Sequence, residues 1–258
     1  INKYLKTISE NKVKYIVYSN GTDVRDRETK KIIIKENPEQ NFIFSENAWL
    51  PWSKYIYADP TGIGNESELF DYTTAGIESY KINENKIKEA TLLINKELSR
   101  GIEIKEQKDY ILVPLQVDND SKLIIGSPDF KNVKSFVEYI IDTTPKNVNI
   151  LFKNHPQNKH KCKIPKVDNV YDITYEKYCK KSLIENSLFV AGINTTFLIE
   201  SMYLLHKTVT YGLDVFSNKN IIIEGYNKSF NDILKENIDV STREKFIKIL
   251  MSRQIKKV

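Results

Sequence analysis

The segment Ile150-Leu-Phe-Lys-Asn-His-Pro156 decides the fold class of this chain. Its apolar start is typical of a buried β-strand, and Pro156 cannot continue such a strand. Lys153, Asn154 and His155 therefore fall where a strand meets a loop, and in open α/β sheets ligands bind at that place. A lysine beside one of only three histidines in the chain suits an anionic ligand such as a phosphate or a carboxylate.

The composition indicates a globular protein of one large domain or two small ones. The 258 residues can bury a substantial core, and the net charge of +5 comes from interspersed basic and acidic side chains, so nucleic acid is not the expected partner. Cys162 and Cys179 form no CxxC pair, which argues against a zinc site or a disulfide framework and favours a reducing compartment. We recognise neither a membrane span nor a signal peptide. Because the chain begins at Ile1, we expect an N-terminal piece to be missing or removed.

Apolar periodicity predicts short strands and one long helix in the first half of the chain. The strands are expected at residues 14–18, 31–34, 42–45 and 54–57. A helix is expected at residues 83–100, and Gly101 ends it. The charged segment 103–109 is expected to be a linker.

The second half alternates strands with helices, which indicates βαβ units and a parallel sheet. Helices are expected at residues 133–142, 175–187 and 195–205, and a basic amphipathic helix at 241–257. Strands are expected at residues 110–115, 148–152, 169–173, 188–191 and 208–211. The predicted fold class is therefore α/β.

Residues 190–200, VAGINTTFLIE, predict a strand that runs into a helix. Asn194, Thr195 and Thr196 have side chains that cap helix starts, and free backbone N–H groups there bind phosphate. Glu200 lies one to two turns into the helix, where its carboxylate can accept hydrogen bonds from ribose hydroxyls. A capped helix with a solvated glutamate explains the same residues, so the motif gains weight mainly from segment 150–156 in the same sheet.

Carboxylates also follow the strand expected at residues 110–115. Gln116, Asp118 and Asp120 lie beyond its end, where carboxylates can act as a base, a nucleophile or metal ligands. An Asp/Asn-rich turn explains the same composition. An EF-hand calcium loop does not explain this composition, because the Gly and the terminal Glu that it requires are absent.

A third motif begins at Glu46, directly after the strand expected at 42–45, and Asp59 follows the next strand. Aromatic side chains between and around these acids can stack on sugar rings, although such residues more often belong to a core. They are Trp49, Trp52, Tyr55 and Tyr57.

Taken in order, these motifs resemble the capsular polysaccharide biosynthesis glycosyltransferases that use CMP-Kdo, the retaining β-Kdo transferases. The similarity spans roughly residues 42–216, and the order of the motifs is more specific than any one of them. The set is Glu46-Asn, Gln116…Asp120-Ser, Lys153-x-His155-Pro156 and Asn194-Thr-Thr…Glu200. The His-Pro element also occurs in bacterial sialyltransferases, which use the related donor CMP-sialic acid.

The resemblance implies a GT-B-like fold, in which two Rossmann-like domains with parallel sheets face a cleft that holds the donor. We place an acceptor-side domain at residues 1–105 and a CMP-sugar-binding domain at 106–258, with a terminal helix that can cross back. The resemblance also implies transfer without a metal or another cofactor. Lys153, His155 and the N–H groups at 194–196 can neutralise the phosphate and the sugar carboxylate of the donor.

By the same resemblance, Asp120 is the candidate nucleophile of a double displacement, and Glu46 is the acid/base on the acceptor hydroxyl. Asp118 competes with Asp120 for the nucleophile role, and in an inverting enzyme one of these carboxylates would be the base without an adduct. His155 is assigned to the CMP phosphate and Glu200 to the ribose. The remaining expected donor-binding residues are Lys153, Pro156, Gln116, Asn194, Thr195 and Thr196, and further candidates for the site are Asp59, Ser121 and Ser127.

Two other functions stay open: an inverting sialyltransferase that uses CMP-sialic acid, and a non-catalytic nucleotide-sugar-binding subunit, which has no need of converging carboxylates. The expected acceptor is a glycan or a lipid-linked glycan. The expected location is the cytoplasm, including the inner face of the bacterial inner membrane. Phe246, Ile249 and Leu250 of the basic C-terminal helix can touch an anionic membrane there, although packing across the domains explains the same pattern.

Overall fold

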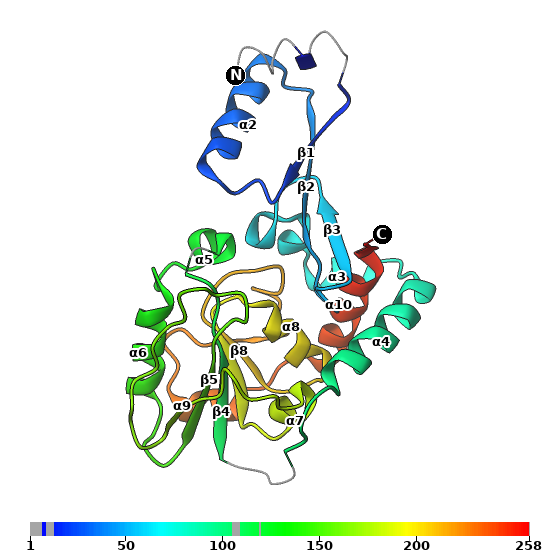
Figure 1. The fold of residues 1–258 in the computed structure, drawn as a ribbon. Helices are drawn as coiled ribbons and strands as arrows, with labels where there is room; N and C mark the ends of the chain where they lie inside the picture. The colour runs from blue at the N-terminus through cyan, green and yellow to red at the C-terminus, as the bar shows by residue number, and fades with distance from the viewer. Residues whose placement is uncertain (1–6, 9–12, 105–108, 119, 258) are drawn as a thin grey trace.

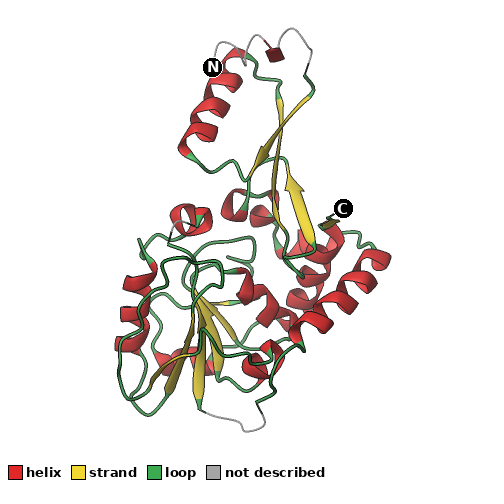
Figure 2. Cartoon of the chain, in the orientation of Figure 1, coloured by secondary structure: helices red, strands yellow, loops and turns green. Residues whose placement is uncertain are grey.

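The computed structural model describes residues 7–8, 13–104, 109–118 and 120–257 and arranges them around two sheets (Figure 1). The strand order is β1-β2-β3-β10 in the first sheet and β6-β5-β4-β7-β8-β9 in the second. Helices cover both faces of the second sheet, while β1, β2 and helix α2 form a smaller part that stands apart from it (Figure 2). The α/β prediction is confirmed. The boundary expected between residues 105 and 106 lies outside the described residues.

The second sheet is parallel, as the alternation of strands and helices predicts. In β4, Ile111 and Val113 face one core, whereas Tyr110 and Leu112 face the other. In β4 and β7 both faces are buried, which explains why these strands are continuous apolar runs. The strands are β4 (Tyr110–Pro114), β5 (Asn149–Lys153), β6 (Val170–Asp172), β7 (Phe189–Gly192), β8 (Thr208–Thr210) and β9 (Ile223–Glu224).

Two groups of helices cover the second sheet. Helices α6 (Val133–Thr143) and α9 (Phe230–Lys235) pack on one face. The other face is covered by α4 (Glu84–Leu98), α7 (Lys180–Glu185), α8 (Thr196–Tyr203) and α10 (Val240–Arg253). The core on this second face continues into the first sheet, where it includes Phe44 and Tyr57. The two sheets therefore share one continuous hydrophobic core.

The first sheet is mixed, which corrects the expectation of two parallel sheets. β1 (Tyr15–Ser19) pairs in parallel with β2 (Asn41–Asn47), but β3 (Tyr55–Asp59) is antiparallel to β2. Residues 48–54 connect β2 to β3, and a parallel crossover needs a connection of about a dozen residues or more. Glu46 consequently lies inside β2, opposite Tyr57, and not after the strand.

Residues 31–34, predicted to be a strand, belong to helix α2 (Val24–Glu36). Asp23 caps this helix by accepting hydrogen bonds from the backbone N–H groups of Arg25 and Asp26. The three consecutive isoleucines resemble a strand, but only Ile33 among them is buried. A cap at the start and the burial of Ile33 thus outweigh the strand propensity of these β-branched residues.

The helix predicted at residues 175–187 begins only at Lys180. Before it, the N–H of Ile102 donates to the carbonyl of Lys177, and the N–H of Cys179 donates to the carbonyl of Ile102. These bonds form a bridge between two extended segments and keep residues 177–179 out of the helix. The remaining short helices are η1 (Gly64–Glu66), η2 (Glu68–Asp71), α3 (Thr74–Ser79) and α5 (Ser121–Gly126).

The C-terminal segment returns to the first sheet. Helix α10 ends at Arg253, earlier than predicted, and β10 (Ile255–Lys256) pairs antiparallel with β3. Phe246, Ile249 and Leu250 are fully buried in the core, where α10 packs against α3, α4 and α8. The apolar residues expected to touch a membrane are therefore not exposed. No helix among the described residues is long and apolar enough to span a bilayer.

Candidate active site

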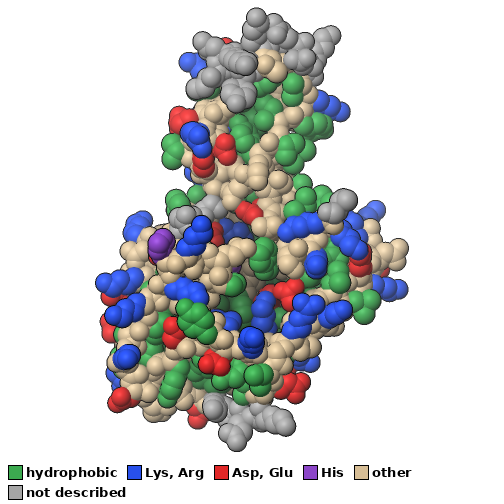
Figure 3. Space-filling model, in the orientation of Figure 1, with side chains coloured by type: hydrophobic (Ala, Val, Ile, Leu, Met, Phe, Trp, Pro, Cys, Tyr) green, Lys and Arg blue, Asp and Glu red, His purple; other side chains and the backbone are tan. Residues whose placement is uncertain are grey.

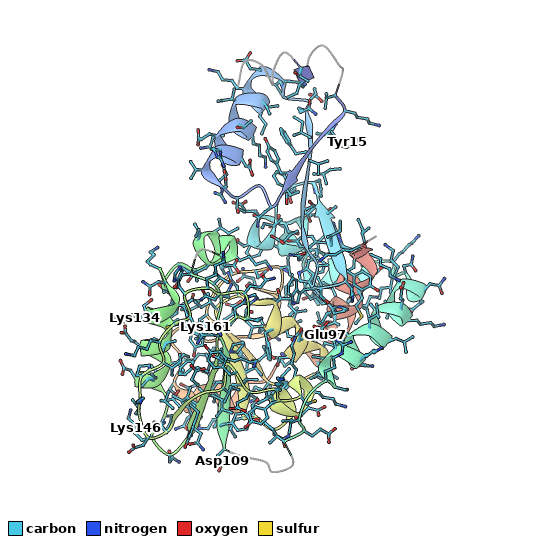
Figure 4. The ribbon with its side chains drawn as sticks, in the orientation of Figure 1. Tyr15, Glu97, Asp109, Lys134, Lys146 and Lys161 are labelled. Carbon is cyan, nitrogen blue, oxygen red and sulfur yellow. The ribbon has the colours of Figure 1, made fainter. Side chains whose placement is uncertain are left out.

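The loops that follow β4, β5 and β7 line a cavity of about 290 Å³. These loops leave the same edge of the parallel sheet, and that edge faces α5 and the first sheet (Figure 1). Asp109, just before β4, marks the opposite edge (Figure 4). The cavity brings together most of the residues predicted for the site: Glu46, Gln116, Asp120, Lys153, His155, Pro156, Asn194, Thr195, Thr196 and Glu200.

The two predicted catalytic carboxylates meet in this cavity. Glu46 Oε2 accepts a hydrogen bond from Asn20 Nδ2 at 2.6 Å, and its Oε1 accepts one from the backbone N–H of Asn47 at 2.6 Å. Asp120 is the N-cap of α5, and its Oδ1 accepts from the N–H of Lys122 at 2.9 Å. These bonds fix the direction in which each carboxylate faces.

A second group of lining residues is basic, and in Figure 3 basic side chains border the hollow below the smaller part of the molecule. Burial, and then the charge of Lys180, lowers the pKa of Lys153. Burial also lowers the pKa of His155, and Asp120 acts in the opposite direction. Nδ1 of His155 accepts the N–H of Gln157 at 3.2 Å, so the neutral imidazole has its proton on Nε2. That proton is available to a ligand oxygen.

Asn194 joins the loops after β4 and β7. It is fully buried, its Oδ1 accepts from Gln116 Nε2 at 2.8 Å, and its backbone N–H donates to Gln116 Oε1 at 3.3 Å. Its Nδ2 donates to the carbonyl groups of Lys122 and Leu213. The N–H of Asn194, expected to contact a phosphate, is therefore already bound to Gln116. Both amide side chains instead hold the floor of the cavity together.

The N-terminus of α8 faces the cavity through Thr195 and Thr196. Thr195 is the N-cap, and its hydroxyl accepts from the N–H of Phe197 at 3.4 Å. Because the first N–H groups of a helix lack partners within the helix, this end attracts anions. The motif at residues 194–196 is thus a helix start, as predicted.

Lys180 and Glu200 form a buried ion pair that the sequence does not predict. Glu200 is 2% exposed, and its two oxygens accept hydrogen bonds from Lys180 Nζ at 2.8 and 3.0 Å. The same Nζ lies 3.5 Å from Glu97, near the end of α4 (Figure 4). Burial opposes the charge of Lys180, but Glu200 and Glu97 outweigh it and raise the pKa of this lysine. Glu200, the residue expected to bind the ribose, thus lines the cavity with its carboxylate paired to the ammonium group of Lys180.

A second buried ion pair, also absent from the sequence prediction, joins Lys122 to Asp214 at 3.0 Å. Burial opposes the charge of Lys122, but Asp214 outweighs it and raises the pKa of this lysine. Lys122 lines the cavity two positions after the nucleophile candidate Asp120. The pair therefore fixes the start of α5 against the loop that follows β8.

Asp59 does not line the cavity. Its Oδ2 accepts from the hydroxyl of Ser67 at 2.6 Å, and its Oδ1 accepts from the backbone N–H of Thr61 at 3.0 Å. Arg253 lies 3.6 Å from the same carboxylate. Asp59 therefore organises the turn after β3, and its place among the site candidates is corrected.

Asp118 and Ser127 also lie outside the cavity. Asp118 is exposed, and its Oδ1 accepts from the N–H of Val133 at the start of α6. The Ser127 hydroxyl donates to the carbonyl of Phe130 at 2.8 Å. Asp118, the alternative candidate for the nucleophile, is thus turned toward α6. Ser121 is the first residue of α5, and its side chain lies outside the described residues.

Three of the four aromatic candidates belong to the core. Trp49 and Tyr57 are buried and stack with their ring centroids 4.2 Å apart, and Tyr55 is buried beside them. Trp52 lines the cavity. It is therefore the member of this group that can contact a sugar ring.

Comparison with known proteins places the chain among its relatives. Residues 67–251 match the family described as capsule polysaccharide biosynthesis protein. Protein FixF of Sinorhizobium fredii (strain NBRC 101917 / NGR234) is 22% identical over 195 residues, which cover 71% of this chain and 45% of FixF. The chain thus spans less than half the length of that curated relative.

Two solved structures of Thermosulfurimonas dismutans KpsC have a similar fold. One is its β-Kdo 2,7 transferase, with a TM-score of 0.64, 17% identity and coverage of 96% of this chain and 79% of that chain. The other is its β-Kdo 2,4 transferase, with a TM-score of 0.64, 15% identity and coverage of 91% and 78%. These similarities support the GT-B-like layout. Since the family match covers residues 67–251, more than half of the chain, the chain belongs to the capsule polysaccharide biosynthesis protein family.

Proposed function

We propose that this protein is a glycosyltransferase that moves Kdo from CMP-Kdo to a hydroxyl group of a glycan acceptor, with retention of configuration. The convergence of Glu46, Asp120 and His155 on one cavity carries the proposal. A protein that only binds a nucleotide sugar has no need of two carboxylates beside a basic anion site. The fold shared with two β-Kdo transferases supports the class of donor.

The basic part of the cavity suits the leaving group. The donor has a phosphate and a sugar carboxylate, so it brings two negative groups. Lys153, the Nε2 proton of His155 and the N-terminus of α8 supply positive charge and hydrogen-bond donors. We propose that these groups neutralise the departing CMP, so that the transfer uses no metal. Glu200, oriented by Lys180, is proposed to accept a hydrogen bond from the ribose.

The acidic part of the cavity suits a double displacement. In the first step, Asp120 attacks the anomeric carbon, the bond to the phosphate oxygen breaks, and CMP leaves with its electron pair. In the second step, Glu46 takes the proton of an acceptor hydroxyl, whose oxygen attacks the anomeric carbon and releases Asp120. Both oxygens of Glu46 accept hydrogen bonds, which hold the carboxylate in place for this role.

The first test combines transfer assays with mass spectrometry. The protein is incubated with CMP-Kdo and a panel of glycan acceptors, and CMP release and product are measured. We expect Asp120→Ala to abolish both, because it removes the nucleophile. Asp118→Ala is the matched control, since Asp118 lies two positions away and outside the cavity. Full activity of Asp120→Ala would exclude its role.

The same assay with CMP-sialic acid decides the class of donor. Both donors have a CMP group and a sugar carboxylate, so the basic cavity suits either. We expect turnover with CMP-Kdo. Use of CMP-sialic acid without use of CMP-Kdo would replace the first proposal by a sialyltransferase. CMP binding without turnover with either donor would favour a non-catalytic subunit.

A further inference from the structure

A second cavity, of about 440 Å³, adjoins the first and shares Glu46, Val117 and Asp120 with it. The rest of its wall comes from the end of β1, from the loop between β1 and α2 and from the first turn of α2. The two proposed reacting carboxylates therefore lie at the boundary between the cavities. A hydroxyl group held in the second cavity can approach both of them while the donor fills the first.

The two cavities differ in charge. Asp23, Asp26, Glu46 and Asp120 line the second cavity, and the described residues of its wall include no Lys, Arg or His. Asp23 is exposed and lies 3.5 Å from Arg25, so its charge is partly balanced. Asp26, Glu46 and Asp120 are half-buried, where salt screens a charge less than at the open surface.

The wall also offers neutral hydrogen-bonding groups on a closely packed loop. Ser19, Asn20 and Thr22 have hydroxyl or amide side chains, and Asn20 donates to Glu46. Gly21 has a φ of +75°, and a Cβ at this position would lie 2.5 Å from the ring of Phe44. Only glycine permits this approach of the loop to β2. The polar groups are thereby held beside the proposed base.

Given the proposed function, we infer that the second cavity binds the acceptor and selects an uncharged sugar over one that has a carboxylate. Sugar hydroxyls can donate to the acids and exchange hydrogen bonds with the neutral side chains of the wall. An acceptor carboxylate would instead meet the half-buried charges of Asp26 and Glu46, while Asp120 is esterified in the adduct, and such like-charge contacts are strongly unfavourable across an interface. The same charge difference directs the anionic donor into the basic cavity.

The test uses matched acceptors that differ by one carboxylate. Methyl glycosides of glucose, galactose and mannose are compared with the methyl glycosides of the corresponding uronic acids, and kcat/KM for transfer from CMP-Kdo is measured at low and high salt. We expect each neutral acceptor that is used to exceed its uronate by at least about tenfold at low salt, with a smaller ratio at high salt. Equal use, or preference for the uronates, overturns the inference.

A pair of variants separates the cavity from the overall charge of the protein. Asp26→Asn removes one half-buried charge from the wall, so the uronate-to-neutral ratio should rise about fivefold. Asp118→Asn removes an exposed charge that lines neither cavity and should leave the ratio unchanged. An unchanged ratio in Asp26→Asn, or equal shifts in both variants, overturns the inference.

Saturation-transfer NMR in the presence of CMP distinguishes failure of this inference from failure of the proposed function. If CMP-Kdo gives no turnover, the proposed function fails, but the two classes of glycoside can still be compared as ligands. Weaker binding of the uronates supports an acceptor cavity that excludes carboxylates. Equal binding of both classes overturns it, even if CMP-Kdo is the donor.

Discussion

The two sheets contribute to the candidate active site in different ways. The parallel sheet supplies three loops from one edge, with Asp120, His155 and the start of α8. The mixed sheet supplies Glu46 from within β2, where its partner strand and two hydrogen bonds fix it. One sheet thus offers many groups for binding, and the other offers one positioned carboxylate.

This difference suggests a division between the two sheets, in which each serves a different step of the proposed transfer. The groups proposed to bind the donor and form the adduct lie on the parallel sheet, while the proposed base and the proposed acceptor cavity belong to the mixed sheet and the β1–α2 loop. If the division holds, variants of the two sheets should block different steps. Loss of the same step from either side would contradict it.

The largest effect on the mixed sheet is expected from Glu46→Gln. This variant keeps the shape of the side chain but removes the proposed base, so kcat should fall by about 10²- to 10⁴-fold. Asp120 should still react with the donor, because its loop is untouched. A burst of CMP release followed by an adduct on Asp120, detected by intact-protein mass spectrometry, is the expected result.

Asp120→Asn is the counterpart on the parallel sheet. It should give neither the burst nor the adduct, because no nucleophile is present for the first step. If Glu46→Gln also gave no burst, Glu46 would act in the first step and the division between the sheets would be wrong.

The sequence predicts the parallel sheet better than the mixed one for a physical reason. Strands β4 and β7 are buried on both faces, and β5 is buried on one face and partly buried on the other, so all three appear as apolar runs with clear ends. The polar residues after those ends identified most of the cavity. Near the first sheet, the apolar run at residues 31–34 resembles a strand but belongs to helix α2. The antiparallel direction of β3 follows from the short connection at residues 48–54, which apolar patterning does not reveal.

A smaller effect is expected at Lys180, among the helices that cover one face of the parallel sheet. Its Nζ contacts Glu200 on α8 and approaches Glu97 on α4. Lys180→Met leaves Glu200 buried without its cation, which should lower the free energy of unfolding by about 3 kcal/mol. Urea denaturation monitored by circular dichroism measures this change.

Lys181→Met is the matched control. Lys181 lies 3.8 Å from Glu185, and both side chains are about half exposed, so its loss should cost less than about 0.5 kcal/mol. The double variant Lys180→Met/Glu200→Met should recover much of the lost stability, because no unpaired charge stays buried. Equal effects of the two single variants would show that the Lys180 pair contributes little.

Lys180 also illustrates what the sequence could not predict about the site. Its partner Glu200 is 20 positions away, and Glu97 is 83 positions away, so no local spacing joins them. Asp59 shows the reverse error. Its position after a strand resembles that of a ligand-binding acid, but Ser67 and Thr61 occupy its oxygens in a turn. Strand ends predict where a cavity forms, whereas side-chain partners decide which acids face it.

The smallest effect concerns the pH dependence of CMP binding. Burial lowers the pKa of His155 in the free protein, and Asp120 opposes this shift. A bound phosphate adds negative charge and favours the imidazolium, so binding should take up a proton and tighten as the pH falls. Between pH 8 and 6.5 the affinity should rise, by less than about tenfold per pH unit. Isothermal titration calorimetry at several pH values measures the affinity for CMP.

His155→Gln should weaken CMP binding and flatten this pH dependence, because glutamine can donate a hydrogen bond but cannot take up a proton. His160→Gln is the matched control: His160 is exposed, follows in the same loop and does not line the cavity. Cytidine, which has no phosphate, should bind with little pH dependence. An unchanged pH slope in His155→Gln would assign the proton to another group, and a slope that disappears in Glu46→Gln would place it on the mixed sheet.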